Sequence, residues 1–272
     1  MFAKLLKYEW KATSGLLGVL TLATVGVGAL LTALLRFLQA APADTPELLL
    51  APVSTILIGG FLAVVAYAFG TQIVLLVRFY KNKYSNEGYL TFTLPVTAHQ
   101  ILLSSLLNYL IWTVISVAVV LAVFTMAIFV GSAPKGFFNK EAWDAMIQTI
   151  RMLSYQEGLV GYVVTILVSS AVSSLASVVL VHTAITLGAV IAKKHKILAA
   201  FGCYYGISMI MGIISSVLMV GIGLMSTVLT TADQLFGGMN IIMILQAVLY
   251  AVIAAIGYFV SHYLMKNKLN LP

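Results

Sequence analysis

Charged side chains are scarce in this chain. Only 8% of its 272 residues are charged, whereas soluble domains contain about 25%. Hydrophobic residues make up 61% of the chain, which is more apolar surface than a packed globular core can bury. The composition therefore excludes an ordinary soluble protein. It predicts an all-α polytopic membrane protein, for which the lipid bilayer acts as the solvent.

Cysteines and catalytic motifs are also scarce. The single cysteine, Cys203, excludes an internal disulfide, and because it lies in an apolar run we expect it to pack as a small side chain. The zinc-protease motif H-E-x-x-H is absent, and the dipeptide Gly-Lys does not occur, so no P-loop for nucleotide phosphates is present. We therefore predict no catalytic residue, no metal site and no directly bound cofactor. Any ATP hydrolysis is expected on a partner polypeptide.

Asp, Glu, Lys and Arg are missing from the centres of the long apolar runs. Transporters driven by protons or ions usually need such residues, so their absence disfavours a secondary transporter. The polar side chains that could line a cavity are Gln72, Asn108 and His182. Hydrogen bonding between helices is the simpler expectation for a lone intramembrane histidine. Close helix packing is the simpler expectation for the serines of residues 169–177 and for Gly202-x-x-x-Gly206.

Six apolar runs are each long enough to cross a bilayer core, which takes about 20 residues. The predicted spans are residues 15–38, 50–77, 100–130, 159–192, 197–229 and 241–264, in one transmembrane domain over residues 1–272. At ~1.5 Å per residue the longest spans exceed the bilayer core, so we expect them to tilt or to project into the cytoplasm. Residues 131–158 are the longest polar segment and are predicted to be extracellular, with a short interfacial helix around Trp143.

Basic residues are distributed unequally between the two sides of the membrane. Six spans place both termini on one side, which carries eleven of the fifteen basic residues and two of the eight acidic residues. That side has a net charge of +9 and the other side −2. Because cytoplasmic loops carry the excess of lysine and arginine, both termini are predicted to be cytoplasmic. The overall charge of +7 therefore reflects orientation and does not indicate nucleic-acid binding.

Residues 1–13 have the pattern of an amphipathic helix that lies in the membrane interface. At ~100° per residue three lysines share one face of this helix: Lys4, Lys7 and Lys11. The opposite face is apolar and includes Trp10, while Glu9 points into the middle of it. Either the Glu9 carboxylate reaches the lipid headgroups, or it forms a buried pair with a cation such as Arg78.

The stretch of residues 81–97, KNKYSNEGYLTFTLPVT, is the least membrane-like part of the first half of the chain. A proline stops a helix, so Pro95 marks this stretch as a short element of its own between the second and third spans. We interpret it as a cytoplasmic docking surface for a soluble partner; the alternative is an amphipathic loop that rests on lipid. Its candidate contact residues are Glu87, Gly88, Tyr89, Leu90, Phe92, Leu94 and Pro95. Glu87 is expected to bond either to a cation of the partner or to backbone N–H groups of its own helix.

These features together resemble a permease subunit of the ABC-2 exporter family, in particular the small bacterial permeases grouped with antimicrobial-peptide export and immunity. The specific part of the resemblance is Lys7-Tyr8-Glu9 and the run from Glu87-Gly88-Tyr89-Leu90 to Thr93-Leu94-Pro95. The resemblance implies that residues 81–97 are a coupling helix and that residues 1–13 are an elbow helix. It also implies two permease subunits, identical or homologous, with two ATP-binding subunits that hold ATP and Mg²⁺. Many members carry a re-entrant outer element between spans 5 and 6, where this chain has only a short loop.

The leading functional prediction is a membrane-spanning permease subunit in the bacterial plasma membrane. It would export an amphiphilic, peptide-like or lipid-like substrate, powered by a separate ATP-binding subunit, with membrane lipids as its other partners and no nucleic acid. The alternatives are a secondary transporter and a structural or sensing membrane protein without transport activity. A P-loop ATPase encoded beside this chain would favour the first.

Overall fold

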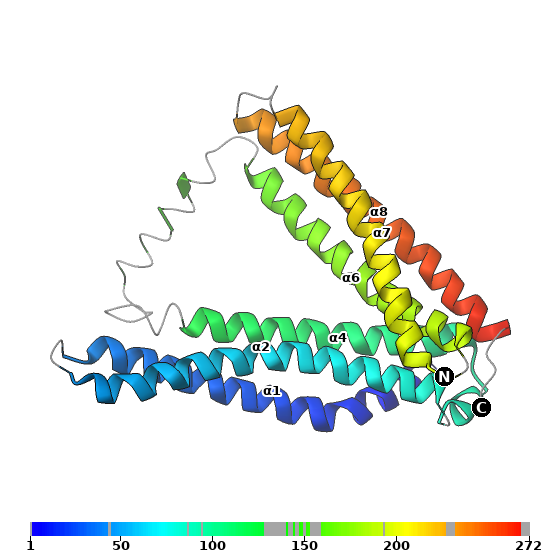
Figure 1. Cartoon of the computed structure of the whole chain (residues 1–272), viewed down its shortest axis with the longest axis horizontal. Coiled ribbons are helices and arrows are strands. Elements are labelled where there is room, and N and C mark those ends of the chain that lie inside the picture. The colour runs from blue at the N-terminus through cyan, green and yellow to red at the C-terminus, as the bar shows by residue number, and fades with distance from the viewer. Residues whose placement is uncertain are drawn as a thin grey trace. The chain divides into compact units, whose positions relative to one another are not determined.

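The computed structural model describes residues 2–42, 45–85, 87–93, 95–127, 159–192, 194–226 and 232–267, with a few residues between 140 and 152. Its helices are α1 (Phe2–Ala40), α2 (Glu47–Tyr84), α3 (Gly88–Phe92), α4 (Ala98–Thr125), α6 (Leu159–Ile191), α7 (Lys196–Ser226) and α8 (Ala232–Asn267) (Figure 1). Within these described residues, six helices are long and apolar enough to cross a membrane. The prediction of an all-α polytopic membrane protein with six spans is therefore confirmed.

Two predicted boundaries differ from the structure or fall outside it. The sixth span was predicted to begin at residue 241, but α8 already begins at Ala232, so the glycine pair Gly237-Gly238 is part of this helix. Glycine is tolerated inside membrane helices, so the pair does not end the helix. Most of the predicted extracellular segment 131–158 and its helix around Trp143 lie outside the described residues.

The chain divides into two compact units, and each is described by itself. The first unit consists of Met1–Arg78 and Leu107–Ile147, and so contains α1, most of α2 and most of α4. The second unit consists of Phe79–Leu106 and Gln148–Pro272, and so contains α3, α6, α7 and α8 together with the adjoining ends of α2 and α4. The predicted docking stretch of residues 81–97 thus belongs to the second unit, and the N-terminal segment belongs to the first.

The first unit is a bundle in which α1, α2 and α4 run side by side (Figure 1). Its core contains Leu31 of α1, Val64 of α2 and Val123 of α4, all buried. Glycine allows close approach, because a Cβ placed on Gly28 would lie 2.6 Å from the Val123 side chain, and one on Gly60 would lie 2.5 Å from that of Leu31. Small residues at contact points hold membrane helices together by packing, since lipid provides no hydrophobic driving force between them.

Helix α1 is continuous from Phe2 to Ala40, whereas the sequence predicted a separate helix over residues 1–13. The two hydroxyl residues at the expected break each bond to carbonyl oxygens of the same helix. Thr13 Oγ1 donates to the carbonyl oxygens of Glu9 and Trp10, both at 3.0 Å, and Ser14 Oγ donates to that of Lys11 at 3.1 Å. No proline interrupts this region, so nothing in the backbone ends the first segment.

The second unit is built on α6, which packs against both α7 and α8 (Figure 1). Helices α6 and α7 approach closely at Gly188 and Ala200, where a Cβ on the glycine would overlap the Ala200 backbone. Ser261 of α8 donates to Thr183 Oγ1 of α6 at 3.2 Å. Among the described residues no atom lies within 4 Å of a Cβ placed on Gly202 or Gly206, so the expected close packing at this pair is not present.

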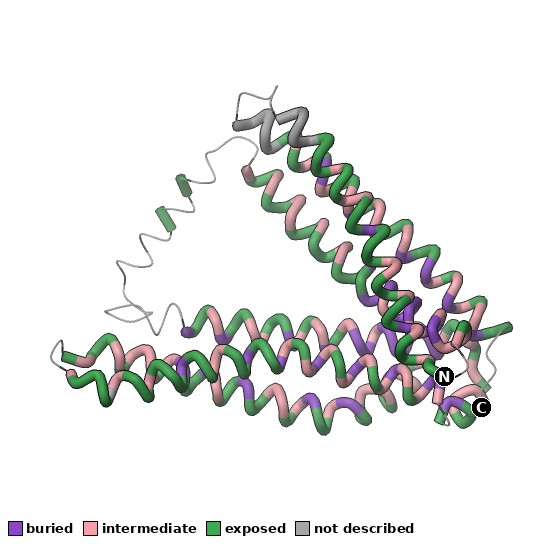
Figure 2. The backbone as a smooth tube through the Cα atoms, viewed as in Figure 1, coloured by how far each residue is buried: buried purple, intermediate pink, exposed green. Residues whose placement is uncertain are grey.

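Buried positions are a minority along every long helix of both units, and the other described positions are exposed or half-buried (Figure 2). In the most apolar 18-residue stretch of α7 only 11% is buried inside the protein. The serines at positions 170, 174 and 177 of α6 are exposed as well, and those at 174 and 177 donate to carbonyl oxygens of their own helix. These large apolar surfaces are compatible with lipid as the surrounding solvent.

Candidate functional site

The connection between α2 and α4 is a folded element with a defined beginning and end. Helix α2 continues to Tyr84, the five-residue helix α3 follows, and α4 starts after Thr97. The backbone N–H of Gln100 donates to Thr97 Oγ1 at 3.3 Å, and the Thr97 N–H donates to Gln100 Oε1 at 3.4 Å. This reciprocal pair is a capping box, which sets the start of α4.

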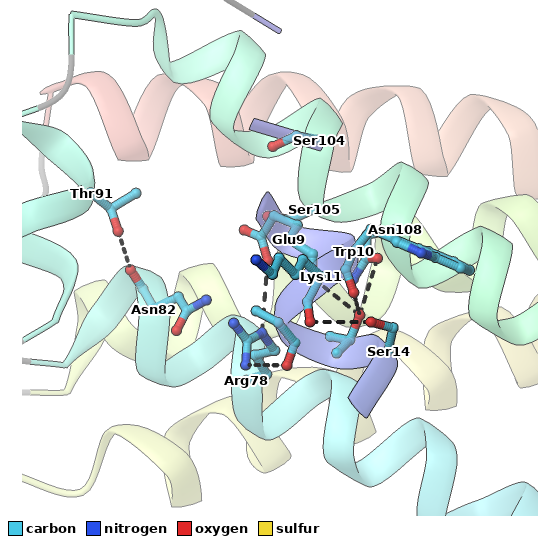
Figure 3. Close-up of polar contacts among 12 residues, drawn as sticks. Glu9, Trp10, Lys11, Ser14, Arg78, Asn82, Thr91, Ser104, Ser105 and Asn108 are labelled. Carbon is cyan, nitrogen blue, oxygen red and sulfur yellow. Dashed lines mark hydrogen bonds and ion pairs between the residues drawn. The ribbon is translucent and has the colours of Figure 1, made fainter. Parts of the chain in front are cut away.

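Helix α3 is packed back onto the end of α2. Gly88 at its first position is buried, and its N–H donates to the Ser85 carbonyl at 2.8 Å. Thr91 Oγ1 donates to the Asn82 carbonyl at 2.9 Å, which joins the middle of α3 to the last turn of α2 (Figure 3). This contact closes a tight reversal of the chain, so α3 does not extend freely from the helix.

The outer face of α3 is apolar and aromatic. Tyr89 is 64% exposed and Leu90 is 69% exposed. Glu87 and Pro95 are also exposed, whereas Phe92 is half-buried. Leu94, which the sequence included among the contact residues, lies outside the described residues. The element therefore presents two large side chains beside an acidic one.

Glu87 stands at the N-cap position of α3 but makes no side-chain cap hydrogen bond. Of the two roles predicted for this carboxylate, the bond to its own helix is therefore not present. The role that remains open is a bond to a cation outside the chain.

Tyr84 anchors the end of α2 within the second unit. Its side chain is fully buried, and its hydroxyl lies 2.6 Å from Thr186 Oγ1 of α6. Its carbonyl oxygen accepts a bond from Lys196 Nζ, at the start of α7, at 3.5 Å. The Phe79 ring packs edge-on against it at 5.7 Å between centroids. One residue thus connects α2 to both α6 and α7.

The three cavity candidates each have a neighbour within their own unit. In the first unit Gln72 Oε1 accepts a bond from Thr113 at 3.4 Å, and Asn108 Oδ1 accepts one from Thr13 at 3.4 Å. In the second unit His182 is buried, with Nδ1 2.7 Å from the Val178 carbonyl oxygen of its own helix. The Phe79 ring lies edge-on at 4.2 Å from the His182 ring, between centroids. These contacts are typical of helix packing.

The N-terminal segment is tied into the first unit by its apolar face. Glu9 Oε2 lies 3.9 Å from Arg78 Nε, so the pairing with Arg78 that the sequence left open is present (Figure 3). The Trp10 ring stacks on that of Trp112 in α4, with centroids 4.8 Å apart and planes 15° from parallel. The predicted lysine face is exposed: Lys4, Lys7 and Lys11.

Sequence reasoning missed Trp112, Thr13, Tyr84 and Thr186. Trp112 Nε1 donates to Thr13 Oγ1 at 2.9 Å, which fastens α4 to the start of α1. The sequence contains thirteen tyrosines, and nothing in its local pattern distinguishes Tyr84 from the others. Only the partner of its hydroxyl, more than a hundred residues later, marks it as an anchor.

Comparisons with known protein families, with curated proteins and with solved structures find no match to this chain. Arguments about its function therefore rest on the residues and on the geometry described above.

Proposed function

We propose that this polytopic membrane protein is the permease subunit of an ATP-driven exporter and that α3 is the element on which a separate ATP-binding subunit docks. The single observation that carries the proposal is the form of the α2–α4 connection. It is a short helix bonded to the last turn of α2 through the Thr91–Asn82 contact. Its Tyr89 and Leu90 side chains are exposed. An element of this kind can transmit force between a soluble motor and the membrane helices.

The anchoring of α3 favours a protein partner over a loop that rests on lipid. Resting on lipid requires only an apolar face, whereas this element is also fixed by the Thr91–Asn82 bond and by buried Gly88. Large exposed aromatic and aliphatic side chains on a rigid support are suited to fill pockets in a partner, because little conformational entropy is lost on binding. The substrate we propose is amphiphilic, and the complex would contain two ATP-binding subunits and a second permease chain, identical or homologous.

Charge reversal at Glu87 tests this proposal directly. We expect Glu87→Lys to insert normally and yet to bind the ATP-binding subunit weakly, or to permit hydrolysis without transport. Removing one partner of a buried charge pair costs about 2–5 kcal/mol, which is enough to loosen a modest interface. Glu87→Gln should be milder because it keeps an acceptor. The measurement is co-purification with any P-loop ATPase that is found encoded beside this chain, together with substrate-stimulated ATP hydrolysis.

A matched control for that experiment is Glu47→Lys. Glu47 is likewise exposed and lies in the first turn of its helix, but the charge distribution places it on the opposite side of the membrane. It should leave both readouts unchanged. If Glu87→Lys binds the ATP-binding subunit and couples hydrolysis to transport as the wild-type protein does, α3 is not the docking element.

The proposed orientation is tested by cysteine labelling. Cys203 is first replaced by alanine, so that each new cysteine is the only thiol. Cysteines at Ser85 and Lys268 are expected to react only with reagent supplied from the cytoplasm, and a cysteine at Lys140 only from outside, because the charge bias places both termini inside. Labelling of the cysteine at Ser85 from outside would show that the topology is the reverse of the proposed one and that α3 cannot dock a cytoplasmic subunit.

A further inference from the structure

We propose that His99 and His262 are the protein ligands of a divalent transition-metal ion between the start of α4 and the end of α8, and that Tyr258 is the positioning residue that orients the His99 ring. This inference does not rest on the proposed function, because it concerns another place in the fold and its test needs no ATP-binding subunit. The sequence predicted no metal site, since the two histidines are too far apart in the chain to form a motif.

Three side chains from two helices meet at this place. The Tyr258 hydroxyl of α8 lies 2.6 Å from His99 Nδ1, in the first turn of α4. The His262 ring lies beside the same histidine, with centroids 6.3 Å apart and planes 75° from parallel. All three residues belong to the second unit. Because His99 is exposed and His262 is half-buried, an ion can reach both rings from water.

Contact with α6 sets the rotation of α8 at this place. A Cβ placed on Gly257 would lie 2.7 Å from Thr183 Oγ1 of α6, and Ser261 donates to the same oxygen at 3.2 Å. Gly257 and Ser261 are four residues apart and so share one helix face. Tyr258 and His262 each follow one of them, and they share the adjacent face at ~100° around the helix. The α6 contact therefore holds both side chains of the site on a rigid support.

The bond to Tyr258 favours the tautomer of His99 that an ion needs. A neutral imidazole carries a proton on one nitrogen and a lone pair on the other. When His99 Nδ1–H donates to the Tyr258 oxygen, Nε2 carries the lone pair and is free to bind an ion. Histidines that bind metals usually donate their second ring N–H to a neighbouring acceptor, which fixes the ring and raises its basicity. Tyr258 supplies such an acceptor without contacting the ion itself.

The separation of the two rings suits a shared ion. Zinc binds an imidazole nitrogen at about 2.0–2.1 Å, and so stands roughly 3.2 Å from the ring centroid. Two rings on one ion then have centroids about 5.2 Å apart at a tetrahedral angle and about 6.4 Å apart on opposite sides of the ion. The observed 6.3 Å lies within this interval. His99 and His262 can therefore share an ion after a rotation of their side chains, without movement of α4 or α8.

The donor set indicates the class of ion. Imidazole nitrogen suits Zn²⁺, Ni²⁺ and Cu²⁺, whereas Ca²⁺ and Mg²⁺ take oxygen ligands. Within the described part of the chain no group of three or more His, Cys, Asp or Glu side chains could hold a metal ion, so water would complete the coordination shell. Lys266, one turn beyond His262, is exposed, and solvent screens its charge from the ion. A bound ion would fasten α4 to α8 and stabilise the second unit.

The first test measures Zn²⁺ binding to the full-length protein. The protein is purified in detergent without a polyhistidine tag, with Cys203 replaced by alanine and metal removed by a chelator. We expect one equivalent of Zn²⁺ to bind and to raise the unfolding temperature, with an affinity that falls as the pH is lowered, because protons compete for imidazole. His99→Ala and His262→Gln should each lose this equivalent. The matched control, His195→Ala, removes an exposed histidine and should keep it.

Co²⁺ provides a second measurement that needs no variant. Its visible absorption shifts and strengthens when nitrogen ligands replace water, so the wild-type protein should change the spectrum of the hydrated ion. An unchanged spectrum overturns the inference. So do several weak equivalents of Zn²⁺ that persist in His99→Ala and His262→Gln, because these would be adventitious surface contacts. Equal loss of binding in His195→Ala overturns it as well.

Tyr258→Phe tests the positioning role. The ring stays in place while the hydroxyl is lost, so Zn²⁺ should bind about tenfold more weakly, as is typical when the partner of a metal-binding histidine is removed. The unfolding temperature of the metal-free protein should stay close to the wild-type value. The matched control is Tyr263→Phe, which removes the hydroxyl of an exposed tyrosine on the same helix and should bind Zn²⁺ as the wild-type protein does. Equal affinities of the two variants would show that Tyr258 does not orient His99.

Discussion

Replacing Gly188 by valine is expected to destabilise the protein by about 3 kcal/mol or more, the upper end of the cost of overpacking. The Cβ alone would overlap the backbone nitrogen and Cα of Ala200. Backbone atoms cannot relieve such an overlap by a change of rotamer, as a flexible side chain can. Helices α6 and α7 would have to separate at the point where they join. The measurement is the thermal unfolding of the detergent-purified protein, together with the yield of folded protein from the membrane.

The matched control is Gly202→Val in α7, two residues after Ala200. Here no described atom lies within 4 Å of the added Cβ, so the substitution changes helix propensity without forcing neighbours apart. It should leave the unfolding temperature near the wild-type value. Equal destabilisation at the two positions would show that the contact between Gly188 and Ala200 does not hold α6 and α7 together.

The second large effect is expected for Trp112→Ala. This side chain is buried, stacks on Trp10 and donates to Thr13, so it joins α4 to the first turns of α1. Truncating a buried tryptophan typically costs about 3–5 kcal/mol in a protein core. The lost packing contacts carry that cost in a membrane bundle as well, because helix association there depends on packing. We expect a lower unfolding temperature and proteolysis of residues 2–12 in an otherwise inserted protein.

Trp112→Phe tests the origin of the effect. The phenyl ring can still stack on Trp10, while the bond to Thr13 is lost, and Thr13 keeps its bonds to the carbonyl oxygens of Glu9 and Trp10. The loss of stability should therefore be close to that of one hydrogen bond, about 1 kcal/mol. If proteolysis of the N-terminal residues is as fast in wild-type protein as in Trp112→Ala, the tryptophan stack does not hold the segment.

The site was only partly predictable, and the reason differs from residue to residue. Pro95 and the polar stretch before it marked a separate short element, because a proline restricts its own backbone and that of its neighbour whatever surrounds it. The possible pairing of Glu9 with Arg78 followed from an acid placed on an apolar face, where it needs a partner. The role of Tyr84 could not be predicted, because it depends on Thr186 and Lys196, which are more than a hundred residues away.

Packing between helices was the least predictable part of the fold. Gly202 and Gly206 have the spacing of a close contact, yet no described atom lies near either, while the contact is made by Gly188. The spacing of glycines along the sequence shows which face of a helix carries small residues. It does not show which neighbouring helix packs against that face. The same limit applies to α1, where the lysine face was predicted but the continuity of the helix through Thr13 was not.

The sequence by itself determined that this is a helical protein of six membrane spans, because the length and hydropathy of each segment act locally, through the thickness of the bilayer and the need to satisfy backbone hydrogen bonds within it. Tertiary structure alone decided which residues hold α3 in place and which segments lie beside it. Those relations depend on contacts between distant parts of the chain, such as Tyr84 with Thr186 and Trp112 with Thr13. The local sequence pattern around each residue does not predict these contacts.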